Sequence, residues 1–239
     1  MPEEADLRKR RQWAAFRDAE AYESRIGRFA LAVDGDAVLE LLAAAGLGPG
    51  TPVLDLPSGA GRMTALLERE RSVRVMAADY NLDMVRVARR RTASPGVRCD
   101  AFAAPFRDGS FGAVVTLRLA FHYTDLSGLA AEIGRILRPG GIWLFDTLNR
   151  GSLRHAGEPL AVLAGRRRSG GLRFTAPAAV AAELERQGFE VLASRSTYLM
   201  PTRLYRFLPG PLLRLATAIE RRVPPQRRVL TFWSARRRS

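Results

Sequence analysis

The chain has 239 residues, of which 47% are hydrophobic, and it carries a formal net charge of +14 with a pI near 11.3. This length and composition predict one domain, residues 1–239, with one substantial core. Cys99 is the only cysteine, which excludes a disulfide framework and a Cys/His metal site and favours a cytoplasmic protein. No stretch of about 18 apolar residues occurs, and no apolar run follows the charged N-terminus, so neither a membrane span nor a signal peptide is predicted.

Arginine supplies nearly all of the positive charge, since Lys9 is the only lysine. The surplus of cations over acids predicts a positive field that attracts anions, nucleic acid or an anionic membrane surface. For each single cluster a solvated surface is the alternative, because the basic residues are dispersed over the whole chain. The clusters are Arg8–Arg11, Arg89–Arg91, Arg166–Arg168, Arg221–Arg222, Arg227–Arg228 and Arg236–Arg238.

The first 50 residues predict helices that precede a sheet. Their aromatic and charged side chains can close over a ligand crevice, and these residues are Trp13, Phe16, Glu20, Tyr22 and Arg28. For Trp13 and Phe16, structural packing is the alternative role.

The segment from Val53 to Arg62 predicts a buried strand that runs into a tight turn containing Gly59 and Gly61. Glycines permit positive φ and a close backbone approach to a ligand. The following residues to Arg69 predict a helix whose N-terminal amides face the same place. The pattern favours a nucleotide-like ligand at this turn, and a purely structural turn is the alternative.

A second apolar strand from Val73 ends in Asp79, about 20 residues after the glycine turn. At this interval a doubly wound fold places an acid on ribose hydroxyls. The alternative is that Asp79 caps the helix predicted over 81–91, although Asn81 can serve as that cap itself. A third strand, beginning at Val97, leads to Asp100, which is expected at the ligand edge of the sheet, where it can accept from an adenine amino group.

The rest of the chain continues to alternate strands and helices. A turn and a fourth strand are predicted over 108–115, a fifth strand near 137–145, and a helix and a sixth strand between 174 and 198. This alternation predicts βαβ units and a mostly parallel sheet. Arg118, His122 and Tyr123 follow the fourth strand and are candidate catalytic residues. The ordinary pKa of a histidine side chain suits a general base at neutral pH, and a packed structural role is the alternative for His122.

Residues 200–228 interrupt the sheet before a last strand and basic tail at 229–239. Leu212, Leu215, Ala216, Ile219 and Val223 recur at helical spacing, with arginines beside them. This pattern predicts a helix packed on the core or on the partner of a homodimer, and, because it is also basic, an interfacial helix in peripheral contact with a membrane is the alternative. Tyr205, Phe207 and Leu208, just before this helix, favour a lipophilic ligand.

These segments together resemble the class I S-adenosylmethionine-dependent methyltransferases, of the small-molecule type, over about residues 20–200. Val53–Arg62 is similar to the family's glycine-rich first motif, and Ala78–Asn81 to its ribose-binding acidic motif. Asp100–Phe106 is similar to the adenine segment. The later similar segments are Asp108–Val115, Leu137–Phe145, Phe174–Pro177 and Gly188–Val191.

The resemblance implies a doubly wound, mostly parallel seven-stranded sheet with a cofactor core at 51–199 and an N-terminal helical lid at 1–50. It also implies an insertion between strands six and seven. S-adenosylmethionine would be the cofactor and S-adenosylhomocysteine its product. Tyr22 and Arg28 would bind the methionine carboxylate. The other implied cofactor residues are Asp55, Pro57, Gly59, Ala60, Gly61, Asp79, Tyr80, Asp100, Ala101 and Leu117.

Pro57 departs from the family pattern, which has a glycine at the start of this turn. Proline fixes φ and lacks an amide hydrogen, so one backbone contact to the cofactor is lost. The resulting hypothesis is methyl transfer by in-line displacement to an O, N or C atom of a small, lipophilic acceptor. The alternatives are an RNA methyltransferase, favoured by the charge, and a binding protein or a different reaction on the same fold.

Overall fold

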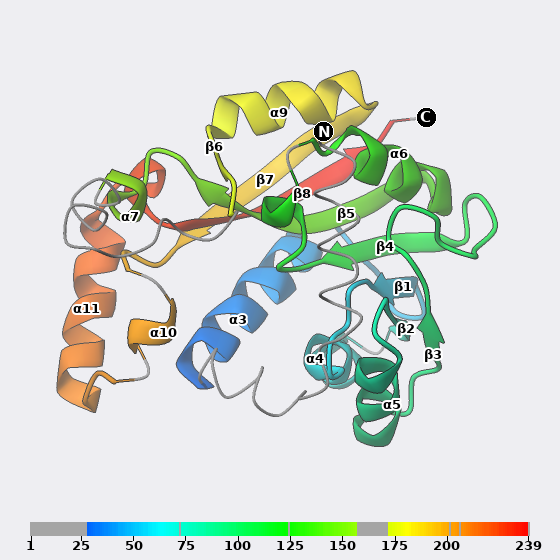
Figure 1. Cartoon of the computed structure of the whole chain (residues 1–239), viewed down its shortest axis with the longest axis horizontal. Helices are drawn as coiled ribbons and strands as arrows, with labels where there is room; N and C mark the ends of the chain where they lie inside the picture. The colour runs from blue at the N-terminus through cyan, green and yellow to red at the C-terminus, as the bar shows by residue number, and fades with distance from the viewer. Residues whose placement is uncertain are drawn as a thin grey trace.

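The computed structural model describes residues 28–71, 73–123, 125–156, 172–200, 202–205 and 207–238. Within these residues one sheet runs in the order β3-β2-β1-β4-β5-β8-β7, and a short β6 pairs with β5 outside this path (Figure 1). β8 is antiparallel to both neighbours, and the other pairings are parallel. The strands are β1 (Pro52–Asp55), β2 (Arg74–Asp79), β3 (Gly96–Arg98), β4 (Phe111–Thr116), β5 (Leu137–Asn149), β6 (Phe174–Thr175), β7 (Phe189–Thr197) and β8 (Leu230–Arg237).

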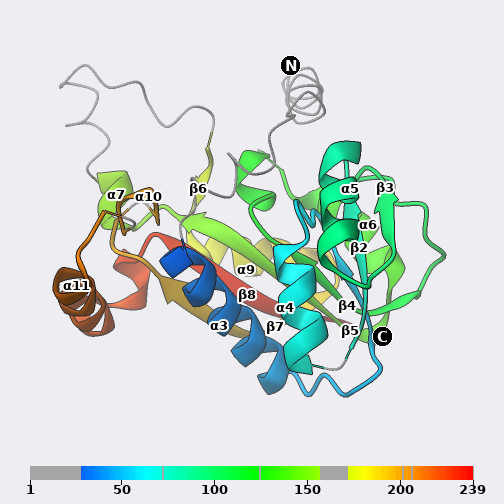
Figure 2. The ribbon, with the colours of Figure 1, turned by 90° about the horizontal axis from the view of Figure 1, so that it is seen from below.

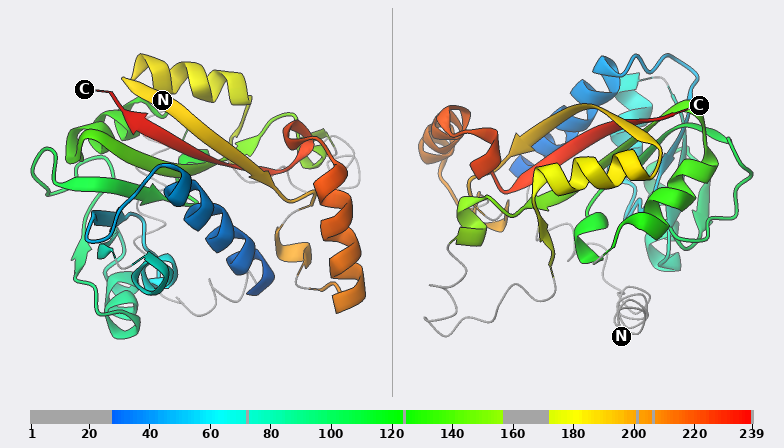
Figure 3. Two further views of the ribbon diagram at one scale, coloured as in Figure 1. Left: turned by 180° about the vertical axis from the view of Figure 1, so that it is seen from behind. Right: turned by 90° about the horizontal axis from the view of Figure 1, so that it is seen from above.

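Helices cover both faces of this sheet, which confirms the predicted doubly wound architecture. α3 (Arg28–Ala44), α4 (Arg62–Arg71) and α5 (Leu82–Arg91) lie on one face. α6 (Ser127–Ile136) and α9 (Pro177–Arg186) lie on the other, as the two views of Figure 3 show. The remaining helical segments are α7 (Leu153–Ala156), α10 (Thr202–Tyr205), α11 (Gly210–Arg222) and the 3₁₀ turns η1 (Ala120–His122) and η2 (Pro225–Arg227).

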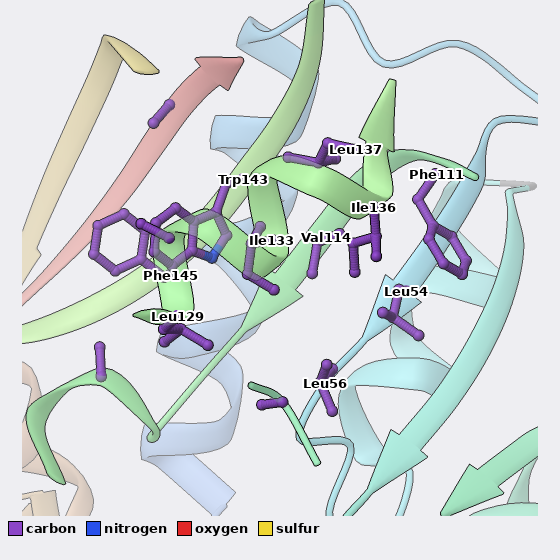
Figure 4. Packing of buried hydrophobic residues seen from close by; sticks show 14 of the residues in the cluster. Leu54, Leu56, Phe111, Val114, Leu129, Ile133, Ile136, Leu137, Trp143 and Phe145 are labelled. Carbon is purple, nitrogen blue, oxygen red and sulfur yellow. The ribbon is translucent and has the colours of Figure 1, made fainter. Parts of the chain in front are cut away.

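The two larger hydrophobic clusters of the described residues form the core, one on each face of the sheet. Val53, Ala113 and Leu144 point to the cluster under α3 and α4, whereas their neighbours Leu54 and Val114 point to the cluster under α6 and α9. Figure 4 shows the second cluster, in which the α6 side chains pack on β1, β4 and β5. Because successive strand residues alternate between faces, both faces are apolar and the strands read as continuous hydrophobic runs.

The structure adds details to the predicted sheet. The third strand is shorter than predicted, since β3 stops at Arg98 and Asp100 lies in a turn closed by a bridge to Ala103. β6 contributes two residues beside the end of β5, beyond the seven predicted strands. The insertion between β7 and β8 contains α10, α11 and η2.

Part of the predicted N-terminal lid is described, and it belongs to the helical layer. α3 packs on β5, β7 and β8, where Ala37, Val38, Leu41 and Leu42 are buried in the core. Residues 1–27, including Tyr22, lie outside the described part of the chain. Among the described helices, none is both long enough and apolar enough to traverse a lipid bilayer.

Candidate functional site

A cleft opens at the carboxyl ends of β1, β2 and β4, the edge where open α/β sheets bind ligands. The space between its walls, including the solvent at its open mouth, is about 1150 Å³. The predicted cofactor residues that line it are Asp55, Pro57, Gly59, Ala60, Asp79, Tyr80, Asp100, Ala101 and Leu117. The lining residues that sequence reasoning missed are Leu56, Ser58, Arg62, Met63, Asn81, Met84, Cys99 and Leu119.

Asp79 connects the end of β2 to the glycine turn. Its Oδ2 accepts from the Gly59 amide at 2.9 Å, and its Oδ1 accepts from the Asn81 amide at 2.8 Å. Burial raises the pKa of this carboxyl, and the amide donors oppose that rise. Asn81 caps α5 by accepting from the Asp83 amide at 2.8 Å, so Asp79 is not needed as the side-chain cap.

The two glycines of the turn have different roles. Both have positive φ, +52° at Gly59 and +80° at Gly61. A Cβ on Gly59 would meet nothing within 4 Å, and this residue faces the cleft. A Cβ on Gly61 would lie 2.7 Å from the Cα of Ala88 in α5, and Gly61 is not among the lining residues. Gly61 therefore allows the turn and α5 to pack closely, while Gly59 leaves space for a ligand.

Pro57 lies on the cleft wall in a turn that already uses its own amides. The Ser58 amide donates to the carbonyl of Ala78 at 2.8 Å, and the Gly59 amide donates to Asp79. Since Pro57 has no amide hydrogen, this turn offers few backbone donors to a ligand.

Asp55 ends β1 at the base of the cleft. Its Oδ2 accepts from the Thr64 hydroxyl at 2.6 Å. Burial is the main reason that the pKa of Asp55 rises from 3.8 to about 7, with the Thr64 hydrogen bond opposing the rise. A carboxyl that titrates near neutral pH inside a cleft is typical of a functional site.

The far end of the cleft carries Asp100 and Tyr80. Asp100 Oδ1 accepts from the Phe102 amide at 3.0 Å, which orders the turn after β3. The guanidinium of Arg98 lies 5.8 Å from the centre of the Tyr80 ring, within the range of a cation–π contact. Cys99 directly precedes Asp100 and also lines the cleft. Burial raises the pKa of its thiol to about 12.

The segment after β4 forms the opposite wall of the cleft. Leu117, Leu119 and Tyr123 line it, and the Tyr123 ring packs on Phe102 with centroids 4.7 Å apart. The His122 ring instead packs on Phe121 at 4.8 Å, and His122 is not a lining residue. The structure thus brings Tyr123 and Arg118 to the cleft and leaves His122 beside it.

Arg118 is at the centre of a buried ionic cluster, here called the Arg118 cluster, formed with Asp34, Asp146 and Tyr198. Its guanidinium donates to Asp34 at 2.5 Å and lies 3.5 Å from Asp146 Oδ2. The Arg118 amide donates to Asp146 Oδ1 at 2.7 Å, and the Tyr198 hydroxyl donates to Asp34 at 2.8 Å.

The two carboxylates hold the pKa of Arg118 well above its ordinary value, against the opposing effect of burial. Burial raises the pKa of Asp146 to about 7. Arg118 therefore remains a cation and cannot accept a proton at the cleft. The side chain of Arg28, the first residue of α3, lies outside the described side chains, so its predicted contact stays a prediction. The described residues include no cluster of three or more side chains suited to bind a metal ion.

Residues 54–145 match the family model described as "Methyltransferase domain". The chain is 38% identical over 93 residues to a ubiquinone/menaquinone biosynthesis C-methyltransferase of Desulfotalea psychrophila, covering 37% of this chain and 38% of that protein. It is 33% identical over 143 residues to a malonyl-[acyl-carrier protein] O-methyltransferase of Serratia marcescens, covering 59% of this chain and 56% of that protein. The chain thus spans 38% of the length of the first relative and 56% of the length of the second.

Among solved structures, the [4+2]-cyclase SpnF has the same fold. The TM-score is 0.61 at 20% identity, covering 85% of this chain and 81% of that one. The strand order, with one antiparallel strand beside the last, and the acid-lined cleft agree with the domain match. Residues 54–145 thus match a methyltransferase domain, and the match and the fold together support a class I S-adenosylmethionine-dependent methyltransferase.

Proposed function

We propose that this protein transfers a methyl group from S-adenosylmethionine to a small, lipophilic acceptor. The observation that carries this proposal is the unequal polarity of the cleft. Asp55, Asp79 and Asp100 line the end formed by β1 to β3. The wall after β4 carries Leu117, Leu119 and Tyr123 beside Arg118, whose charge is paired with Asp34 and Asp146. Polar and acidic groups suit a nucleoside with hydroxyl and amino donors, and the apolar wall suits an acceptor with little polarity.

Several residues of the cleft fit the cofactor. Asp79 is fixed by two amides and keeps lone pairs that can accept from ribose hydroxyls. Asp100 would accept from the adenine amino group, with Tyr80 and Ala101 beside the ring. Gly59 leaves open space for the backbone approach of the cofactor. Contact of Tyr22 and Arg28 with the methionine carboxylate remains part of the proposal.

The reaction is an in-line displacement at the methyl carbon. S-adenosylmethionine supplies a methyl group on a positively charged sulfur, which is a good leaving group. The bond from the acceptor to carbon forms as the carbon–sulfur bond breaks, and S-adenosylhomocysteine is released. The protein's part is to hold the acceptor in line with the methyl group and to exclude water.

An acidic acceptor would also lose a proton during transfer. Tyr123 lies on the cleft wall and is the described candidate that could contact the acceptor. His122 packs on Phe121 and does not line the cleft, and its role as a base stays a prediction. Arg118 is a positioning residue in this scheme, since its charge is held by Asp34 and Asp146.

The test is isothermal titration with S-adenosylmethionine and S-adenosylhomocysteine, followed by transfer of an isotopically labelled methyl group. Quinol and acyl-chain acceptors are the first candidates, because the similar proteins are a quinone C-methyltransferase and an acyl-carrier-protein O-methyltransferase. We expect cofactor binding and label in an organic-extractable product. Absence of binding at millimolar cofactor would remove the proposal.

A different reaction on the same cofactor fold is the second candidate, because a [4+2]-cyclase has this fold and Pro57 removes a backbone donor from the turn. Binding of S-adenosylmethionine without its conversion to S-adenosylhomocysteine would favour this candidate.

Methylation of RNA is a third candidate that rests on the net charge of +14. Transfer of the labelled methyl group to RNA, with RNA binding that falls steeply as salt rises, would favour it. A cytoplasmic location, a homodimer and peripheral contact of the insertion with a membrane are further parts of the prediction.

A further inference from the structure

α11 lies outside both helical layers, at the end of the sheet where β7 and β5 finish (Figure 2). One face of this helix is fixed to the protein. Leu213 and Ala216 pack against the core, and Glu220 accepts from the Tyr198 amide at 2.8 Å and from the Tyr205 hydroxyl at 3.2 Å. These residues recur at helical spacing, so α11 is held in a defined orientation.

The adjacent face of α11 exposes a second apolar stripe. Leu212, Leu215 and Ile219 are 51%, 56% and 45% exposed, and they recur at spacings of three and four residues. Phe207, just before the helix, is 67% exposed. Neighbouring apolar side chains in water are unfavourable, and such a patch on a soluble protein marks an interaction surface. We call these four residues the α11 stripe.

Positive charge surrounds the α11 stripe. Between residues 200 and 228 the sequence has seven arginines and one acid, Glu220, which faces inward. Arg214, Arg221, Arg222 and Arg227 are exposed. A symmetric contact with a second copy would bring these cations together, which disfavours a dimer through this face. An anionic partner is favoured instead.

The chemistry of the stripe selects among anionic partners. RNA would satisfy the arginines, but its phosphates would leave the aliphatic side chains without apolar contacts. A lipid surface satisfies both, because acyl chains accept the stripe and anionic headgroups accept the guanidinium groups. Long arginine side chains can reach headgroups while their stems stay near the acyl boundary.

The topology places this surface at the same edge of the sheet as the cleft. The insertion leaves the sheet after β7 and returns at the start of β8, and both points lie at the carboxyl edge, where β1 and β4 also end. We propose that the α11 stripe and its surrounding arginines dock the protein on an anionic lipid membrane, with the carboxyl edge of the sheet beside the membrane. The proposal does not depend on the identity of the acceptor or on methyl transfer.

Vesicle sedimentation with the full chain tests the proposal. We expect binding to vesicles of phosphatidylcholine with phosphatidylglycerol, much weaker binding to phosphatidylcholine alone, and weaker binding at high salt. The variant with Leu212→Ser, Leu215→Ser and Ile219→Ser should bind the anionic vesicles about tenfold less or weaker still. The matched control is Leu82→Ser with Val191→Ser, which changes exposed apolar side chains elsewhere and should bind like the wild type.

Each result decides the matter. Vesicle binding by the serine variant at the wild-type level, or no binding by the wild type, overturns the proposal. Self-association that the serine substitutions abolish, without vesicle binding, assigns the surface to a dimer, and RNA binding without vesicle binding assigns it to RNA. An unchanged thermal midpoint in the serine variant shows that the fold is retained. Since no cofactor is added, failure here is distinct from failure of the proposed methyl transfer.

Discussion

At the residue scale, the carboxylate of Asp79 orders the glycine turn and also lines the cleft. The Asp79→Ala variant should bind S-adenosylhomocysteine about tenfold to hundredfold less tightly, since hydrogen bonds to a charged group are lost. Isothermal titration measures this. Asp83→Ala is the control, because Asp83 pairs with Arg86 at the exposed surface of α5. Equal affinity of the two variants would contradict the assignment.

Gly61 and Gly59 give a matched pair of substitutions. Gly61→Ala should lower the free energy of unfolding by about 2–4 kcal/mol, because positive φ and a contact with the Ala88 backbone act together. Gly59→Ala has the φ penalty without the contact, and should lose about 1–2 kcal/mol. Its added methyl group should weaken cofactor binding instead. Urea unfolding would reveal an error in this ranking if Gly59→Ala were the less stable variant.

Asp55 should make stability depend on pH. Its pKa is raised from 3.8 to about 7 in the folded state, so the folded protein holds a proton that the unfolded chain releases. The stability contributed by that protonated carboxyl is complete below about pH 4 and is lost as pH rises to about 7. Asp55→Asn should therefore lose less stability than the wild type between about pH 5 and about pH 8. Urea unfolding at both values measures the difference, and an equal loss in both proteins would refute it.

At the scale of elements, the Arg118 cluster joins α3, the segment after β4, β5 and the start of the insertion. Arg118→Met leaves Asp34 and Asp146 buried without their cation, and should cost about 3–5 kcal/mol of unfolding free energy. Tyr198→Phe removes one hydrogen bond and should cost about 1 kcal/mol. Denaturant titration compares these variants with Arg195→Met.

The Arg195 control tests burial as the cause. Arg195 also joins α3 to another element, through Glu40, but this pair is largely exposed and should contribute less than about 1 kcal/mol. If Arg118→Met and Arg195→Met destabilised the protein equally, burial of the cluster would not be the source of its stability. The double variant of Arg118 and Tyr198 should be less destabilised than the sum, because both side chains contact Asp34.

For the whole molecule, cofactor binding should be linked to global stability, because the cleft exists only when β1, β2 and β4 are assembled. S-adenosylhomocysteine at about 100 times its Kd adds about 2.7 kcal/mol to the folded state. For a domain of this size, that raises the Tm by about 5–10 °C. Differential scanning fluorimetry measures the shift, and Asp79→Ala at the same ligand concentration should show a much smaller one.

The spacing of residues in the sequence predicts which acidic side chains lie at the carboxyl edge of the sheet. Alternating strands and helices predict a parallel sheet, and the carboxyl ends of parallel strands meet at one edge, so Asp55, Asp79 and Asp100 were expected together. The sequence does not predict the contacts between segments that lie far apart along the chain. Arg118 pairs with Asp34 over 84 residues, and Tyr198 reaches Asp34 over 164 residues. Periodicity reports which face a side chain occupies, and it contains no information about its partner on another element.

The sequence by itself determined the order of the elements, the acidic strand ends and the amphipathic character of the insertion, because these depend on local patterns of residue types. Only the tertiary structure decided the different roles of Gly59 and Gly61, the position of His122 outside the cleft lining and the pairing of Arg118 with two buried carboxylates. It also decided which face of α11 is fixed by Glu220 and which stays exposed. The physical reason is that close approach, burial and pairing depend on distances between segments that lie far apart along the chain.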